Sequence, residues 1–242
     1  MPPPKYLAQA NRLVAAFPAE SRSIFLDRCE LVDLHQHDVL TQEGQHAEYA
    51  YFPVDSFVAA MLNLDGDSAV QVGLMGSEGM VNVSSALGIG VASLTSLVQG
   101  AGRAFRMGHQ DLIEQLETNF GLRGVLHRYA ALRMTQLAQN MACAGCHAVE
   151  KRLARWLLMA RDRAHSNELL LTHEILAFML GVRRESVTQA ASAFQKDGLI
   201  SYSRGDLLLL DEKGLLATAC TCYQKDLDMY ERAMGNSVVG WV

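Results

Sequence analysis

The sequence predicts an α+β fold with an antiparallel β-rich N-terminal part, a long helix and a C-terminal winged helix-turn-helix. Residues 31–107 contain short apolar runs broken by turn signals, with no helical runs between them, which is typical of an antiparallel β-roll, barrel or sandwich. A proline-free helical pattern then runs from Phe120 to Ala142. Residues 170–210 combine two short helices, a glycine turn and two strands, which is the order of elements in a winged helix-turn-helix.

The N-terminal part is expected to begin with helical structure over residues 5–30. Five strands are then predicted at residues 38–41, 49–52, 56–64, 68–74 and 94–107. Asp65-Gly66 lies between two apolar-rich runs, and this pair is a strong signal for a tight hairpin turn. Helices do not alternate with these strands, so a parallel sheet is not expected.

The long helix is preceded by a short one at residues 109–117, and Asn119 is a candidate cap at its start. Five of its residues follow heptad spacing and predict a dimer interface: Leu122, Val125, Tyr129, Leu132 and Gln136. The alternative is that this face is buried against the helix's own domain. A further helix is expected from His147 to Arg163.

The helix-turn-helix is expected to begin at Thr172, a plausible N-cap, and to turn at Gly181. The second helix has its apolar residues at i, i+3, i+4 and i+7 spacing, which predicts that Val187, Ala190, Ala191 and Phe194 face the core. Asp197-Gly198 ends that helix. Strands at 199–203 and 207–210 then form the wing.

Charge is distributed unevenly along the chain. The net charge is −5, yet residues 151–205 carry nine basic and five acidic side chains. A positive segment of this kind is expected of a DNA-contacting module. The candidate DNA-binding residues are Thr172, Arg183, Arg184, Glu185, Ser186, Thr188 and Gln189. Arginine can pair with guanine, glutamate can accept from cytosine and glutamine can pair with adenine. The alternative is a winged helix that contacts only protein.

Four segments resemble the Crp/Fnr regulator superfamily of bacteria: "YAYFPVDSFVAAML", "VGLMGSEGM", "CHAVEKRLARWLLMARDR" and "LTHEILAFMLGVRRESVTQAASAFQKDGLI". They occur in the family's order and span about residues 20 to 225. The resemblance implies a β-roll like those that bind cyclic nucleotides, and a homodimer that reads a two-fold symmetric site on double-stranded DNA. By their positions, Arg184 and Glu185 match the family's base-reading residues, whereas Gln189 stands where many members have a basic residue.

The resemblance also places an effector pocket at Gly76, Glu78 and Gly79. Members that bind cyclic nucleotides hold the phosphate with an arginine shortly downstream, but residues 88–98 contain none. Because an anionic phosphate without a cationic partner is costly to bury, the usual mode of cAMP binding is not expected. Members with an iron–sulfur cluster need several cysteines near the N-terminus, where Cys29 stands alone. The sequence leaves the effector unidentified.

The alternative function is a haem or metal-binding redox or sensor protein built on Cys143, Cys146 and His147, since C-x-x-C-H is the c-type haem attachment motif. A structural metal site at these residues would require a fourth ligand. Cys220 and Cys222 are candidates, but the sequence does not bring them near. In the strand region, His35, His37 and His46 are interpreted as surface or core histidines in preference to ligands.

The expected domains are a sensor domain at 1–118, a dimerisation helix at 119–146 and a DNA-binding domain with a helical tail at 147–242. That acidic tail is open to two interpretations, packing on the dimer or contact with RNA polymerase. A signal peptide and a membrane segment are not apparent in the sequence, which predicts a cytoplasmic protein with reduced cysteines and no membrane partner. Motifs of common enzyme classes are also absent from the sequence, so an enzyme is not expected.

Overall fold

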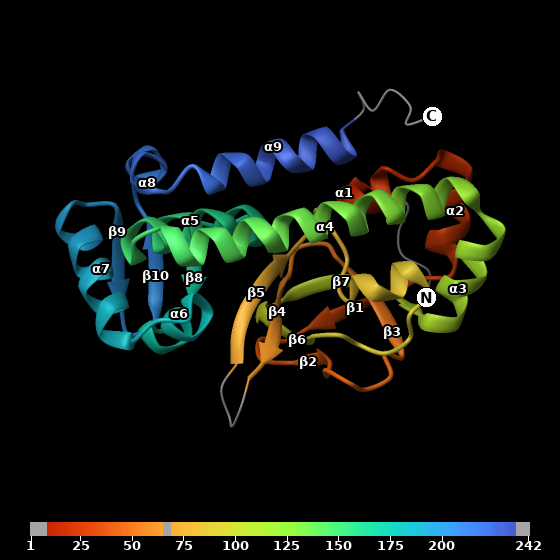
Figure 1. The fold of residues 1–242 in the computed structure, drawn as a ribbon, viewed down its shortest axis with the longest axis horizontal. Helices are drawn as coiled ribbons and strands as arrows, with labels where there is room; N and C mark the ends of the chain where they lie inside the picture. The colour runs from red at the N-terminus through yellow and green to blue at the C-terminus, as the bar shows by residue number, and fades with distance from the viewer. Residues whose placement is uncertain (1–8, 65–68, 236–242) are drawn as a thin grey trace.

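The computed structural model describes residues 9–64 and 69–235. A β-roll lies beneath one long helix, and a small domain of helices and short strands lies at the far end of that helix (Figure 1). Two helices precede the roll, α1 (Arg12–Ala15) and α2 (Ala19–Asp27). The single helical stretch expected over residues 5–30 is therefore interrupted, because Pro18 precedes α2 as its N-cap and proline has no N–H to continue a helix. Residues 5–8 lie outside the described residues.

The roll consists of two antiparallel sheets, which confirms the predicted fold class. One sheet has the order β1-β7-β3 and the other has the order β2-β6-β4-β5. The strands are β1 (Glu30–Leu34), β2 (Val39–Thr41), β3 (Tyr49–Pro53), β4 (Phe57–Asn63), β5 (Ala69–Met75), β6 (Thr95–Gly100) and β7 (Gly102–Gly108). Strands β4 and β5 pair as the predicted hairpin, although its Asp65-Gly66 turn lies outside the described residues.

The prediction of one strand over residues 94–107 is wrong, because β6 and β7 belong to different sheets. The chain passes from one sheet to the other at Gly102. A Cβ atom at this position would lie 2.6 Å from the carbonyl oxygen of Asp55. Only glycine permits the two backbone segments to approach so closely.

Helices cover the roll and connect it to the C-terminal domain. After the short 3₁₀ helix η2 (Val83–Leu87) come α3 (His109–Thr118), α4 (Phe120–Cys146) and α5 (Val149–Ala164). The predicted cap of the long helix is confirmed, since the Asn119 side chain accepts a hydrogen bond from the Leu122 N–H at 3.0 Å. After α4 the chain turns at His147, and α5 leads into the C-terminal domain (Figure 1).

The C-terminal domain contains α6 (His173–Leu180), α7 (Arg184–Lys196) and a three-stranded sheet with the order β8-β10-β9. The strands are β8 (Glu168–Leu170), β9 (Ile200–Ser203) and β10 (Asp206–Leu209). Two more helices follow, α8 (Glu212–Thr218) and α9 (Cys222–Met234). Helix α9 runs back alongside α4 towards the roll (Figure 1). Strand β8 was not predicted.

The C-terminal domain and the roll share one hydrophobic core. Phe57 of β4 and Leu74 of β5 belong to the same buried cluster as Leu157 of α5 and Met179 of α6. A hydrogen bond of 3.0 Å from Trp156 Nε1 to Gln71 Oε1 also crosses this contact. The helix-turn-helix is therefore packed directly on the β4–β5 hairpin. In the described part of the chain, none of the helices has the length and apolarity needed to cross a bilayer.

Candidate functional site

The helix-turn-helix forms where the sequence predicts it. The Thr172 hydroxyl accepts a hydrogen bond from the Ile175 N–H at 3.2 Å and so caps α6. Gly181 follows α6 with a φ of +62°, a conformation that glycine adopts without the penalty of a Cβ atom. The Gly181 N–H satisfies carbonyl groups of the last turn of α6, and the chain then enters α7.

Helix α7 has one buried face and one polar face, as its spacing indicates. The four residues predicted to face the core are buried: Val187, Ala190, Ala191 and Phe194. The residues proposed for DNA contact lie elsewhere on the surface. Thr172, Arg183, Arg184, Glu185, Thr188 and Gln189 are exposed, and Ser186 is half-buried. The polar face thus combines two cations with a carboxylate, an amide and a hydroxyl at the N-terminal end of the helix.

One side chain beside this surface was not recognised from the sequence. His173 of α6 stacks on Tyr202 of β9, with ring centroids 4.3 Å apart and planes inclined at 15°. Its Nδ1 lies 3.0 Å from the Thr188 hydroxyl, which itself donates to the Arg184 carbonyl. Partial burial, followed by the charge of Arg184, lowers the pKa of His173 below its usual value. This stack joins α6, α7 and the wing at one place.

The wing adds a further cation that the sequence analysis did not single out. The β9–β10 turn contains Arg204 and Gly205, with φ values of +53° and +96°. Arg204 is exposed at this turn. The sequence position of Arg204, between two predicted strands, could have identified it as a candidate, because a basic residue at a hairpin tip is suited to a phosphate contact.

The residues predicted to form an effector pocket contact other parts of the chain. Glu78 pairs with Arg163 of α5, and both side chains are largely buried. A Cβ atom at Gly76 would lie 2.6 Å from Cγ of Arg163, and one at Gly79 would lie 1.9 Å from the hydroxyl of Tyr129. Side chains of α4 and α5 therefore lie against the two glycines, and the Glu78 carboxylate is engaged by Arg163.

A different cavity lies between the roll and the wing. Its volume is about 690 Å³, and its lining includes Phe57, Gln99 and Ala101 from the roll, Leu169 from β8 and Leu207 from the wing. The Gln99 side-chain oxygen is buried and has no hydrogen-bond partner among the described residues. A ligand in this cavity would contact both domains at once.

The face of α4 that was predicted to form a dimer interface is covered within the chain. Leu122, Val125, Tyr129, Leu132 and Gln136 are all buried within the chain, with exposed fractions from 0% to 4%. The first four pack into the core of the N-terminal domain, and the Gln136 oxygen accepts a hydrogen bond from Arg133 at 2.7 Å. This face of α4 is therefore buried against its own domain, which was the alternative interpretation of the heptad spacing.

The opposite side of α4 carries a second apolar stripe. The exposed residues His127, Ala131, Met134, Ala138 and Met141 repeat at alternating intervals of four and three. Met134 is 71% exposed and Met141 is 76% exposed. We call these five residues the α4 stripe. Heptad spacing on an exposed helix face is suited to pairing with another helix.

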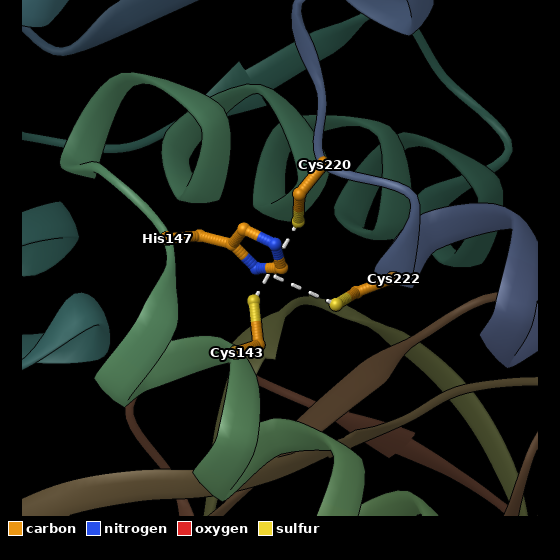
Figure 2. Close-up of side chains that lie close together, drawn as sticks. All are labelled: Cys143, His147, Cys220 and Cys222. Carbon is orange, nitrogen blue, oxygen red and sulfur yellow. Dashed lines mark hydrogen bonds between the residues drawn. The ribbon is translucent and has the colours of Figure 1, made fainter.

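The C-x-x-C-H motif does not hold together as one site. Cys143 is buried, whereas Cys146 is exposed. Cys143 and His147 instead meet Cys220, which lies between α8 and α9, and Cys222, the first residue of α9 (Figure 2). One ligand atom from each of these four residues lies within 4.8 Å of the others. We call them the Cys/His cluster. The sequence named all four residues but could not bring the two pairs together.

The thiols of the Cys/His cluster differ in acidity. The pKa of Cys143 is lowered to about 4, mainly because it accepts a hydrogen bond from Cys220, with His147 and Arg155 adding to the effect. Donating that hydrogen bond raises the pKa of Cys220. Burial raises the pKa of Cys222. The remaining histidines of the roll lie elsewhere: His46 packs edge-on against His109, at 5.7 Å between ring centroids, and the His35 side chain is 80% exposed.

Comparison with known proteins identifies a family that the C-terminal domain matches. The family described as "Crp-like helix-turn-helix domain" matches residues 151–218. This segment is a Crp-like helix-turn-helix domain. The match covers most of α5, the helix-turn-helix, the wing and α8, so it includes every residue predicted to contact DNA.

Solved structures share the fold beyond the Crp-like helix-turn-helix domain. FixK2 from Bradyrhizobium japonicum is 16% identical, with a TM-score of 0.66 over 79% of this chain and 98% of its own. A Crp-family transcriptional regulator from Thermus thermophilus is 18% identical, with a TM-score of 0.65 over 78% and 96%. The c-di-GMP responsive global regulator CLP from Xanthomonas campestris is 15% identical, with a TM-score of 0.64 over 80% and 100%.

No curated protein sequence matches the chain. The resemblance predicted from sequence is nevertheless confirmed in the C-terminal domain by the family match, and the solved structures show that the fold of the whole chain is shared. The similarity is thus one of sequence in the helix-turn-helix domain and one of fold in the β-roll and the long helix.

Proposed function

We propose that this protein is a transcription regulator that binds a specific DNA sequence through α7. The observation that carries the proposal is the exposed polar face at the start of α7, with Arg183, Arg184 and Glu185 on a Crp-like helix-turn-helix domain. The described residues include no ion pair made by these three side chains. These three side chains are therefore available to bind DNA. The protein is proposed to act in the cytoplasm, on chromosomal DNA.

The residues have distinct proposed roles. Arg184 and Glu185 reach base edges in the major groove, because an arginine can pair with guanine and a glutamate accepts from the cytosine amino group. Gln189, one turn further along the same face, reads a third base pair. Thr172, Arg183 and the wing residue Arg204 contact the phosphate backbone and fix the orientation of the helix. Ser186 and Thr188 are proposed to make further DNA contacts at the edge of this surface.

The protein is proposed to act as a homodimer on a palindromic site. The α4 stripe supports this proposal, since it presents two methionines and two alanines to solvent at heptad spacing. Exposed apolar surface of this kind is costly in a monomer and is suited to a second copy of the same helix. Two parallel copies of α4 would place two α7 helices on the same side of the dimer, as a palindrome requires.

Regulation is proposed to pass through the contact between the roll and the C-terminal domain. The Glu78–Arg163 ion pair and the Trp156–Gln71 hydrogen bond join the two parts directly. An effector that separates or tightens them, for example in the cavity between roll and wing, would change the orientation of α7.

Selection from a randomised DNA library tests the proposal. Bound sequences would be enriched over several rounds with the full-length chain and no effector, then again with cell extract added. Enrichment of a palindrome by the wild-type chain, lost in Arg184→Ala, is the expected result. Absence of any enriched motif under both conditions would contradict sequence-specific binding.

A further inference from the structure

We propose that Cys143, His147, Cys220 and Cys222 bind one zinc ion. The distances within the Cys/His cluster fit this ion. The sulfur atoms of Cys143 and Cys220 are 3.6 Å apart, and the sulfur of Cys222 is 3.6 Å from Nδ1 of His147 (Figure 2). With Zn–S bonds of about 2.3 Å and a Zn–N bond of about 2.0 Å, tetrahedral geometry gives about 3.8 Å between two sulfurs and about 3.5 Å between sulfur and nitrogen.

The donor set identifies the class of metal site. Three thiolates and one imidazole are a usual ligand set for structural zinc, and four protein ligands leave no open position for a substrate. All four ligand atoms lie within 4.8 Å of one another. An iron–sulfur cluster spreads its ligands over two or more irons, so this compact arrangement favours a single ion.

Neighbouring side chains complete the site. The Gln139 amide donates a hydrogen bond of 2.9 Å to the sulfur of Cys222, and such donors hold a metal-bound thiolate in place. Zinc with three thiolates and a neutral imidazole carries one net negative charge. Arg155 is buried beside the cluster, and its Nε has no hydrogen-bond partner among the described residues. Its positive charge acts on Cys143 and Cys222 and would offset the charge of the loaded site.

The ligands come from two separate parts of the chain, which gives the ion a structural role. Cys143 lies in the last turns of α4 and His147 directly follows that helix. Cys220 lies between α8 and α9, and Cys222 is the first residue of α9. One ion would therefore fix the junction between α4 and α5 to the start of the returning helix α9.

Binding also has a defined proton balance. The thiols must lose their protons to become ligands, so zinc binding releases up to three protons to the solvent and changes no oxidation state. A disulfide between Cys143 and Cys220 is a different outcome, because it removes two electrons and two protons and needs an oxidant. The two outcomes can be distinguished by counting metal and free thiols on the same sample.

Elemental analysis of the full-length chain, purified under reducing conditions, tests the proposal. The expected content is one zinc per chain, and cobalt in its place should give the visible absorption of a tetrahedral thiolate site. Cys143→Ser and Cys220→Ser should lower zinc affinity by more than the ten- to hundredfold that loss of an outer partner costs. The matched control is Cys146→Ser, because Cys146 belongs to the same motif but is exposed outside the cluster.

The readout does not depend on DNA binding, so it separates this proposal from the proposed function. If the serine variants fail to fold, competition between wild-type protein and a chelator still measures affinity, and removal of zinc should lower the melting temperature. Three results would overturn the proposal: a reduced wild-type chain that takes up no zinc, equal zinc affinity in Cys220→Ser and wild type, or a Cys143–Cys220 disulfide in the reduced preparation.

Discussion

Arg163 of α5 and Glu78 of the roll form a buried ion pair in which two guanidinium nitrogens lie 2.8 Å and 2.7 Å from the same carboxylate oxygen. The other carboxylate oxygen accepts from the Gly76 N–H at 3.1 Å, and the Glu78 carbonyl accepts from the Tyr230 hydroxyl of α9 at 2.8 Å. One residue of the roll thus contacts both α5 and α9. The glutamate that resembles an effector ligand in sequence is used here to join the two domains.

Glu78→Gln is expected to destabilise the protein by about 3–5 kcal/mol, because it leaves the buried charge of Arg163 without its partner. Urea unfolding followed by circular dichroism measures the effect. Glu231→Gln is the matched control, since Glu231 pairs with Arg12 at the surface, where both side chains are more than half exposed, and such pairs contribute about 0–1 kcal/mol. Equal costs for the two variants would show that the buried pair is not a structural link.

Met134→Glu is expected to weaken the proposed dimer at least about tenfold, or about 1.4 kcal/mol, because each chain would place a carboxylate in the seam between two α4 helices. Sedimentation equilibrium over a range of concentrations measures the change. Ile24→Glu makes the same kind of substitution at an exposed residue of α2 and should leave the dimer intact. A wild-type chain that sediments as a monomer at micromolar concentration would contradict the role of the α4 stripe.

Arg184→Ala is expected to reduce affinity for the selected DNA site by about 1–3 kcal/mol, the usual value of a bidentate contact to a base. Affinity for random DNA should fall by less, because that binding depends on phosphate contacts. Fluorescence anisotropy at one fixed salt concentration compares the two. Lys213→Ala, at an exposed basic residue of α8, controls for the loss of one charge. Identical losses on specific and random DNA would refute a base-reading role.

Stability is expected to fall on the acid side partly because of His109. Burial, and then the charge of His46, lower the pKa of His109 below its usual value of 6.5. The unfolded chain therefore takes up this proton at a higher pH than the folded chain, and folding loses free energy as the pH falls below about 6.5. His109→Gln should show a smaller loss of stability between pH 7.5 and 5.5 than wild type, measured by urea unfolding. Substitution of the exposed His35 is the control.

The helix-turn-helix could be predicted from sequence because its signals are local. The Thr172 cap, the Gly181 turn and the four buried residues of α7 each depend on neighbours only a few positions away. Local spacing also gave the start and the cap of α4, although the helix continues to Cys146, beyond the predicted end at Ala142. The strand β8 was missed because three residues are too few for a period to be recognised.

The face of α4 that meets a partner could not be chosen from sequence. The buried series at Leu122 and the exposed α4 stripe at Met134 both follow heptad spacing, and they differ by the side of the helix that the roll covers. Periodicity reports that a face is apolar without reporting what covers it. The exposed face is recognisable only once the position of the roll is known.

The Cys/His cluster and the Glu78–Arg163 pair depend on contacts between distant parts of the chain. Cys143 and Cys220 are separated by 77 residues, and Glu78 and Arg163 by 85. Both contacts require the path of α9 and the packing of α5 on the roll. No local pattern specifies either contact. The sequence therefore identified candidate residues but could not show which distant residues they contact.

The return of α9 also has a mechanical consequence. The C-terminal domain is attached to the roll at one end through α4 and α5 and at the other through α9, whose Glu231 reaches Arg12 of α1. A domain connected through one helix can rotate freely about that connection. A domain connected through two neighbouring helices can rotate only if one helix moves relative to the other. Reorientation of α7 must therefore release the packing on the β4–β5 hairpin and also slide α9 along α4 or detach its far end. Helices α1 and α9 thus limit how far the proposed DNA-binding surface can turn.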